Sequence, residues 1–152
     1  MKLEKVDFQI IGIKHTANFA EYPTIIPDKV QQMQRRENEL SNVTTKRVIV
    51  YEPKKDRHHD TGYFYTGVIV KEENKNIPDD MEALHLAGEY AVLETIFDGN
   101  RMGEFYTKLD QWILENGYRH KQDELIIEVY EEKDGELALT IYMPFSQIIR
   151  SS

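Results

Sequence analysis

One charged residue of the sequence stands in the middle of an otherwise apolar segment. Glu128 lies within IIEVYEE, residues 126–132, whose isoleucine, valine and tyrosine residues favour a β-strand. Two placements are open at this point: an exposed glutamate on a solvated strand, or a carboxylate in a binding site. In a site walled by aromatic rings, desolvation raises the pKa of a carboxylate unless a positive charge lies beside it. Glu128 is therefore the candidate anchor for a cationic molecule.

Tyrosines are the second group of residues that could contact a ligand. Strand side chains alternate between faces, so Glu128 shares a side with Tyr130, and we assign Thr140 and Tyr142 of the following strand to that side. Tyrosine suits a surface that is apolar on one side and wet on the other, and each ring attracts a nearby cation by about 0.5–2 kcal/mol. We expect the opposite, aliphatic faces to carry the helices. The expected ligand contacts are Glu128, Tyr130, Tyr63, Tyr65, Tyr90, Tyr142 and Trp112, although the core of a helix is the simpler place for Trp112.

Other kinds of chemistry have less support in the sequence. The segment DRHHD offers Asp56, His58, His59 and Asp60, but this spacing fits no zinc pattern. The chain has no cysteine, no G-x-S-x-G motif and no phosphate-binding glycine loop, so we expect no metal and no cofactor. An enzyme stays an alternative: Glu128 would act as a general base on water, with a nearby tyrosine as the acid, to hydrolyse a reactive small molecule.

The composition limits the class of protein. The chain has 152 residues and a net charge of −8, which fits one acidic domain, residues 1–152, that can bury a core. An acidic surface repels a phosphate backbone, so we expect no direct binding to nucleic acid. The sequence has no signal peptide and no apolar run of about 20 residues, so we expect a cytoplasmic protein that does not bind a membrane. A protein partner that docks on the acidic surface is a further alternative.

The elements that must position these residues follow a repeated order. Helices are expected at 28–42 and 99–118, and residues 71–88 are expected to form a connector. The tight-turn signal KDG predicts a hairpin between the last two strands. The expected strands are 6–13, 47–53, 63–70, 89–96, 124–132 and 136–145. The sequence thus predicts an α+β fold of two β-α-β-β modules, at about 4–72 and 86–146, with antiparallel sheets around a central cleft and helices on the outer face.

The two halves also resemble each other in sequence. VIVYEPKKD at 48–56 aligns with IEVYEEKDG at 127–135, and this alignment matches Tyr51 to Tyr130. Ile49 stands where the second half has Glu128. The charged residue is therefore a departure from its own repeat.

Four stretches, in this order, resemble the GyrI-like small-molecule-binding domain, which is also the effector domain of AraC-type and MerR-type multidrug regulators. The first is FQIIGI at 8–13, and the second is VYEPKKDRHHDTGYFYTGVIV at 50–70, with its interval from Gly62 to Gly67. The third is IPDDMEALHLAGEYAVLE at 77–94, and the fourth is YTKLDQWILENGY at 106–118 followed by ELIIEVY at 124–130. The four stretches span nearly the whole chain, and it is their order together, rather than any single stretch, that makes the resemblance to this family specific.

The resemblance implies a pseudo-twofold pair of modules around an aromatic-lined cleft in a cytoplasmic, bacterial protein. In multidrug-sensing relatives, a buried glutamate of the last-but-one strand contacts lipophilic cations, and Glu128 matches that position. The implied function is the binding of a hydrophobic, cationic or polar-aromatic small molecule, linked to transcription regulation or to sequestration of a drug or toxin. A gyrase-inhibitor-like interaction module is the alternative. No helix-turn-helix segment precedes the domain, so we expect a stand-alone domain.

Overall fold

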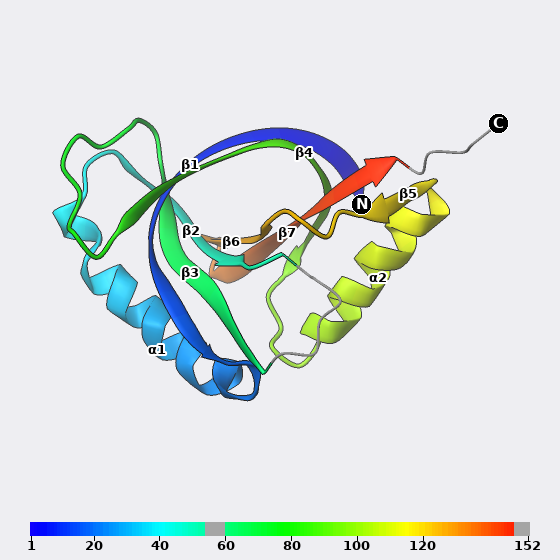
Figure 1. Ribbon diagram of the computed structural model, residues 1–152, viewed down its shortest axis with the longest axis horizontal. Helices are drawn as coiled ribbons and strands as arrows, with labels where there is room; N and C mark the ends of the chain where they lie inside the picture. The colour runs from blue at the N-terminus through cyan, green and yellow to red at the C-terminus, as the bar shows by residue number, and fades with distance from the viewer. Residues whose placement is uncertain (54–59, 148–152) are drawn as a thin grey trace.

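A computed structural model of the chain describes residues 1–53 and 60–147. This part of the chain folds into two α-helices and antiparallel strands, as the sequence predicted for an α+β protein (Figure 1). Short 3₁₀ turns, Phe19–Glu21 and Glu37–Glu39, flank the first helix. The elements are β1 (Lys2–Asn18), α1 (Tyr22–Arg35), β2 (Val43–Tyr51), β3 (Thr61–Val70), β4 (Glu82–Ile96), α2 (Met102–Glu115), β5 (Tyr118–His120), β6 (Ile126–Lys133) and β7 (Glu136–Gln147).

The bounds of several elements differ from the prediction. α1 begins at Tyr22, because Pro23 occupies the first turn of the helix, where its missing N–H leaves no hydrogen bond unmade. β4 begins at Glu82, so the predicted connector 71–88 contains the first residues of a long strand. The short strand β5 was not predicted, and it pairs with the end of β7. The order of elements is β-α-β-β over 2–70 and, with β5 added, again over 82–147. Duplication of a module stays a prediction.

The sheet closes on itself, which the sequence did not predict. The strand order is β4-β1-β3-β2-β6-β7-β5, and β4 also pairs with β7, so six strands form a ring. β1 and β4 make this possible because each is long enough to pair with one neighbour through its first half and with another through its second half. The two strands arch over the other four in Figure 1. The expected pair of sheets on either side of a cleft is therefore replaced by one continuous sheet.

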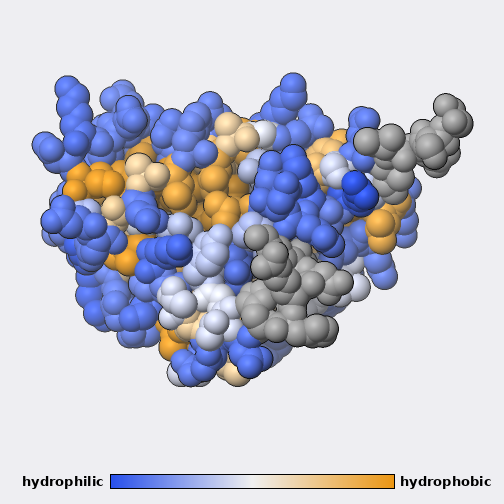
Figure 2. Space-filling model, viewed as in Figure 1, coloured by the Kyte–Doolittle hydropathy of each residue, from blue (hydrophilic) through white to orange (hydrophobic). Residues whose placement is uncertain are grey.

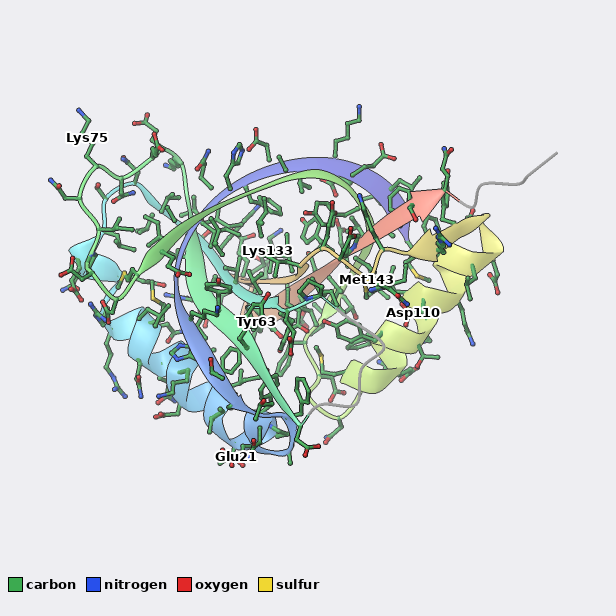
Figure 3. The ribbon with its side chains drawn as sticks, in the orientation of Figure 1. Glu21, Tyr63, Lys75, Asp110, Lys133 and Met143 are labelled. Atoms are coloured by element: carbon green, nitrogen blue, oxygen red, sulfur yellow. The ribbon has the colours of Figure 1, made fainter. Side chains whose placement is uncertain are left out.

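The interior of the ring is an apolar core that contains most of the predicted tyrosines. Val50, Val92 and Ile127 are fully or almost fully buried there. Tyr65, Tyr90 and Tyr142 are buried in the same cluster, and Tyr63 packs against it. Figure 3 shows side chains filling the space below the β1–β4 arch, with Tyr63 labelled on β3. In Figure 2 apolar surface is visible below this arch, bordered by hydrophilic side chains.

Both helices cover the outer face of the ring, and Glu128 lies on this same face. Phe105, Leu109 and Ile113 of α2 pack with Leu139 and Ile141 of β7. Met33 of α1 packs in a separate cluster against β1 and β3. The predicted assignment of faces was therefore wrong for β6: its residues Ile127 and Val129 point into the ring, and the face with Glu128 is the one that the helices cover.

The hairpin between β6 and β7 explains this placement. Asp134 and Gly135 have φ angles of 51° and 82°, the left-handed backbone that a two-residue turn requires. The turn sets Lys133 opposite Glu136, and the register that follows sets Glu128 opposite Ile141. Residues that lie directly opposite share a face. Glu128 therefore shares its face with the aliphatic residues of β7 and not with Thr140 and Tyr142, which is the face predicted from the sequence.

Candidate ligand-binding site

A cavity of about 980 Å³ lies between α1 and α2 above strands β2, β3 and β6. Its volume is at the upper end of the range for small-molecule sites, which is about 300–1,000 Å³. Most of its lining is apolar, and Ile26, Val30 and Met33 of α1 face Met102 of α2 and Ile49 of β2 across it. The cavity can therefore accept a bulky hydrophobic molecule.

Glu128 forms part of the floor of this cavity. The residue is only 2% exposed, and its side chain lies between Ile49 of β2 and Ile141 of β7 in the register of the sheet. Three tyrosine hydroxyls donate hydrogen bonds to its carboxylate. The Oη atoms of Tyr130 and Tyr51 lie 2.7 Å and 3.3 Å from Oε1, and the Oη of Tyr106 donates to Oε2. The carboxylate is thus buried and held in one orientation.

The electrostatics of this cluster follow from burial. Desolvation raises the pKa of Glu128, and the hydrogen bonds from Tyr106, Tyr130 and Tyr51 act in the opposite direction, because they stabilise the charged form. Burial and the neighbouring carboxylate raise the pKa of each of the three tyrosines, so their hydroxyls stay protonated donors. Within residues 1–53 and 60–147, no basic side chain forms an ion pair with Glu128. A cation in the cavity would supply the missing positive charge.

The three tyrosines come from three different elements. Tyr130 follows Glu128 by two residues on β6 and therefore shares its face. Tyr51 stands two residues after Ile49, which the register pairs with Glu128. Tyr106 lies on α2, four residues after Met102, so both side chains project from one side of the helix. The cluster forms only when the strands pair and α2 packs on the sheet.

Sequence reasoning missed Tyr51 and Tyr106 as site residues. A signal for Tyr51 existed, because the internal alignment matches it to Tyr130. A weaker signal for Tyr106 was its spacing from Met102 and Leu109 along the apolar stripe of α2. Neither signal indicates on its own that the hydroxyls converge on one carboxylate.

The predicted site residues lie in three different parts of the structure. Glu128 and Tyr130 line the cavity together. Trp112 packs against the core cluster between α2 and the sheet. The other four point into the ring, where Tyr63 and Tyr65 form one edge-to-face pair and Tyr90 and Tyr142 form another, with ring centroids 6.1 Å and 6.2 Å apart. These five residues, Trp112, Tyr63, Tyr65, Tyr90 and Tyr142, do not line the cavity that contains Glu128.

An ion pair and a threonine are among the further polar groups of the lining. Arg47 of β2 donates to Glu37, with Nε 2.8 Å from Oε1 and a second nitrogen 3.2 Å from Oε2. This bidentate geometry satisfies both groups, so they neutralise each other at one end of the cavity. Elsewhere in the lining, Thr66 of β3 lies with its Oγ1 3.1 Å from Nε2 of His15. The cavity therefore has polar groups in addition to Glu128.

Metal-binding residues do not converge in the described part of the chain. Among residues 1–53 and 60–147, no three histidine, aspartate or glutamate side chains lie close enough to hold an ion. Three of the candidate metal ligands in the sequence, Asp56, His58 and His59, lie outside the described residues. In the same described ranges, neither helix is long and apolar enough to cross a membrane.

Comparison with known proteins identifies the fold. A family model described as "GyrI-like small molecule binding domain" matches residues 2–146. No curated protein matches the sequence. The fold is similar to the crystal structure of the EcmrR C-terminal domain, with a TM-score of 0.69, 17% identity and 97% of both chains covered. It is also similar to EcmrR in a complex with DNA, with a TM-score of 0.67 and 16% identity, covering 97% of this chain and 57% of that one.

A third similar structure contains a ligand. SAV2435 bound to tetraphenylphosphonium has a TM-score of 0.64 and 15% identity, with 95% of this chain and 93% of that chain covered. At these identities the structural likeness shows the fold alone. The family model covers nearly the whole chain, which confirms the resemblance found in the sequence. The chain belongs to the GyrI-like small-molecule-binding domain family.

Proposed function

We propose that this protein binds a hydrophobic cation in the cavity between α1 and α2, with Glu128 as the anchor of the positive charge. The observation that carries the proposal is a buried carboxylate that three tyrosine hydroxyls orient and that no described basic side chain neutralises. The family description, a small-molecule-binding domain, and the tetraphenylphosphonium bound to SAV2435 support it.

The energetics favour a cation with a large apolar surface. At about 4 Å and an effective dielectric constant of about 20, a positive charge gains about 4 kcal/mol from the carboxylate. Contact with the faces of aromatic rings adds about 0.5–2 kcal/mol for each ring. The apolar lining contributes about 25 cal/mol for each Å² of ligand surface removed from water. These gains must exceed the loss of translational and rotational freedom on binding, so a small hydrophilic cation would bind weakly.

Titration of the purified protein with tetraphenylphosphonium, followed by tyrosine and tryptophan fluorescence, tests this function. The uncharged tetraphenylmethane, which has the same four phenyl rings, serves as the matched probe without a positive charge. We expect the cation to bind more tightly than the uncharged probe. Glu128→Gln should lower the affinity for the cation by about 30-fold or more, which corresponds to the cost of removing one partner of a buried charge pair.

Two variants control for indirect effects. Glu131→Gln makes the same change in net charge on the same strand, but its side chain bonds to Thr45 and Lys133 outside the cavity, so the affinity should not change. Tyr63→Phe removes a hydroxyl from the interior of the ring and should also leave binding intact. Equal affinity of wild type and Glu128→Gln for the cation would refute the proposed anchor.

A role in regulation or in sequestration follows from the same binding event. We propose that the bound cation either is held away from its target or stabilises one conformation of the domain for a partner. Pull-down from cells with and without tetraphenylphosphonium distinguishes the two roles, because only the second predicts a partner whose recovery depends on the cation.

The same residues favour hydrolysis as a second candidate function. Glu128 has a raised pKa and lies beside protonated phenols, which is the arrangement of a general base next to a general acid. The discriminating assay is turnover of an electrophilic substrate in excess over the protein. Product beyond one equivalent that Glu128→Gln abolishes would favour the hydrolase, and its absence would favour the binding protein.

A further inference from the structure

The cavity contains a second buried polar residue that the proposed function does not use. Among residues 1–53 and 60–147, Thr66 and Glu128 are the buried side chains of polar or charged type, with exposed fractions of 1% and 2%. Both line the same cavity. A buried polar group costs stability unless it is hydrogen-bonded. The coincidence of both groups in one cavity suggests a shared role.

The register of the sheet fixes the relation between the two residues. Ile49 of β2 is paired with Thr66 of β3 on one side and with Glu128 of β6 on the other. All three side chains therefore point to the same face, in one row across three strands. Adjacent strands are about 4.8 Å apart, so the Cα atoms of Thr66 and Glu128 are separated by about 10 Å. Along this row, the floor of the cavity presents a polar residue, Thr66, then an apolar one, Ile49, and then a charged one, Glu128.

Thr66 keeps unused hydrogen-bonding capacity. Its hydroxyl can donate one hydrogen bond and accept two, and one of these positions is taken by Nε2 of His15 at 3.1 Å. The His15 ring is fixed by packing on Phe64, with ring centroids 5.2 Å apart. Desolvation, with Lys29 nearby, lowers the pKa of His15, so the neutral imidazole is the favoured form. The remaining capacity of Thr66 is available to a molecule in the cavity.

Tyr22 adds a third polar atom on the same side of the cavity. Its ring packs edge-to-face on Phe64 at 5.0 Å, so Tyr22 and His15 both contact Phe64. The Oη of Tyr22 is buried and has no hydrogen-bond partner among the described residues, although Tyr22 lines the cavity. A buried hydroxyl without a partner is unusual in a folded protein and calls for an explanation. A polar atom of the ligand would provide one.

We propose that Thr66, held by His15 and assisted by Tyr22, forms a second contact site that selects, among hydrophobic cations, those with a hydroxyl, ether or carbonyl oxygen about 10 Å from the charge. This inference rests on the proposed function, because it assumes that Glu128 holds the cation. The charge fixes one end of the ligand, the apolar row over Ile49 accepts its middle, and Thr66 accepts its polar end. The cavity then distinguishes two cations of equal charge and similar size.

The experiment compares ω-hydroxyalkyl triphenylphosphonium ions with alkyl triphenylphosphonium ions of the same chain length, over graded lengths, by calorimetric titration. Wild type should prefer the hydroxyl probe by about two- to tenfold at one optimal length, which is the value of one hydrogen bond. Thr66→Val should abolish this preference without lowering the affinity for the alkyl probe. Thr66→Ser keeps the hydroxyl and should restore the preference. Thr16→Val, at an exposed position of β1, is the matched control and should behave as wild type.

Tyr22→Phe provides an independent variant if Thr66→Val does not fold. It removes only the hydroxyl and should reduce the preference while the alkyl probe binds as before. No preference for the hydroxyl probe at any length, or an equal loss for both probes in Thr66→Val, would overturn the second contact site. If both probes bind equally and still depend on Glu128, the proposed function stands and this inference alone fails. If neither probe binds, both fail together.

Discussion

Burial of Glu128 has a consequence for the stability of the protein that can be measured without any ligand. The pKa of a free glutamate is about 4.5, and burial raises the pKa of Glu128 in the folded state. The folded state therefore binds this proton more tightly than the unfolded state. The stability that this tighter binding of the proton to Glu128 contributes is fully present below pH 4.5 and is lost as the pH rises through the pKa of Glu128 in the folded state. Glu128→Gln has no such proton.

The magnitude follows from the linkage between pKa and stability. Each unit by which burial raises the pKa of Glu128 removes about 1.4 kcal/mol from the free energy of unfolding above that pKa. Glu128→Gln should equal wild type near pH 4.5 and become progressively more stable than wild type as the pH rises. For a domain of about 150 residues, 1.4 kcal/mol corresponds to a rise in Tm of about 3–6 °C.

The assay is chemical denaturation of both proteins at pH 5, 6, 7 and 8. Only the difference between variant and wild type is interpreted, because the subtraction removes the contributions of other groups, such as His15. Glu131→Gln is the matched control. The hydrogen bond from Thr45 lowers the pKa of Glu131, so its contribution changes only below pH 4.5 and the difference should be flat from pH 5 to 8. A flat difference for Glu128→Gln as well would refute the argument that burial dominates at Glu128.

Three further predictions follow from the same structure. Below the folded pKa of Glu128, binding of tetraphenylphosphonium should release up to one proton, which calorimetry in buffers of different ionisation enthalpy detects; Glu128→Gln should release none. Tyr106→Phe removes the donor to Oε2 of Glu128 and should lower the free energy of unfolding by about 1–3 kcal/mol in denaturant titrations. Gly67→Ala should destabilise the protein, because a Cβ at Gly67 would lie 2.5 Å from the carbonyl oxygen of Ile11. Gly103→Ala on α2 should be neutral or stabilising, because its Cβ would meet no atom within 4 Å and alanine favours a helix more than glycine does. Thermal unfolding measures both variants, and equal effects would contradict the close approach of β1 and β3.

Local patterns in the sequence were sufficient to find the helices and the main strands. The apolar stripe of α2 predicted a helix at 99–118, and the structure has it at Met102–Glu115. The turn signal at Asp134 and Gly135 predicted the hairpin that the structure contains. Bounds were less accurate where an element depends on distant partners. β1 and β4 extend well beyond their predicted ranges because their ends pair with strands far away in the sequence.

The sequence could not predict whether the face of the sheet that carries Glu128 is covered by the helices. Alternation establishes that Glu128 and Tyr130 share a side, but it says nothing about which side the helices cover. The ring of strands decides this, because closure gives the sheet an inside and an outside. Tyr63 and Tyr142 then belong to the inside, and the helices cover the outside.

The sequence alone determined that Glu128 is exceptional, since a carboxylate in an apolar strand departs both from its neighbours and from Ile49, its counterpart in the first half. Tertiary structure decided what surrounds it. Tyr51 and Tyr106 reach its carboxylate from 77 and 22 residues away along the chain, through strand pairing and helix packing. Such contacts depend on the register between distant segments, and no local periodicity encodes that register.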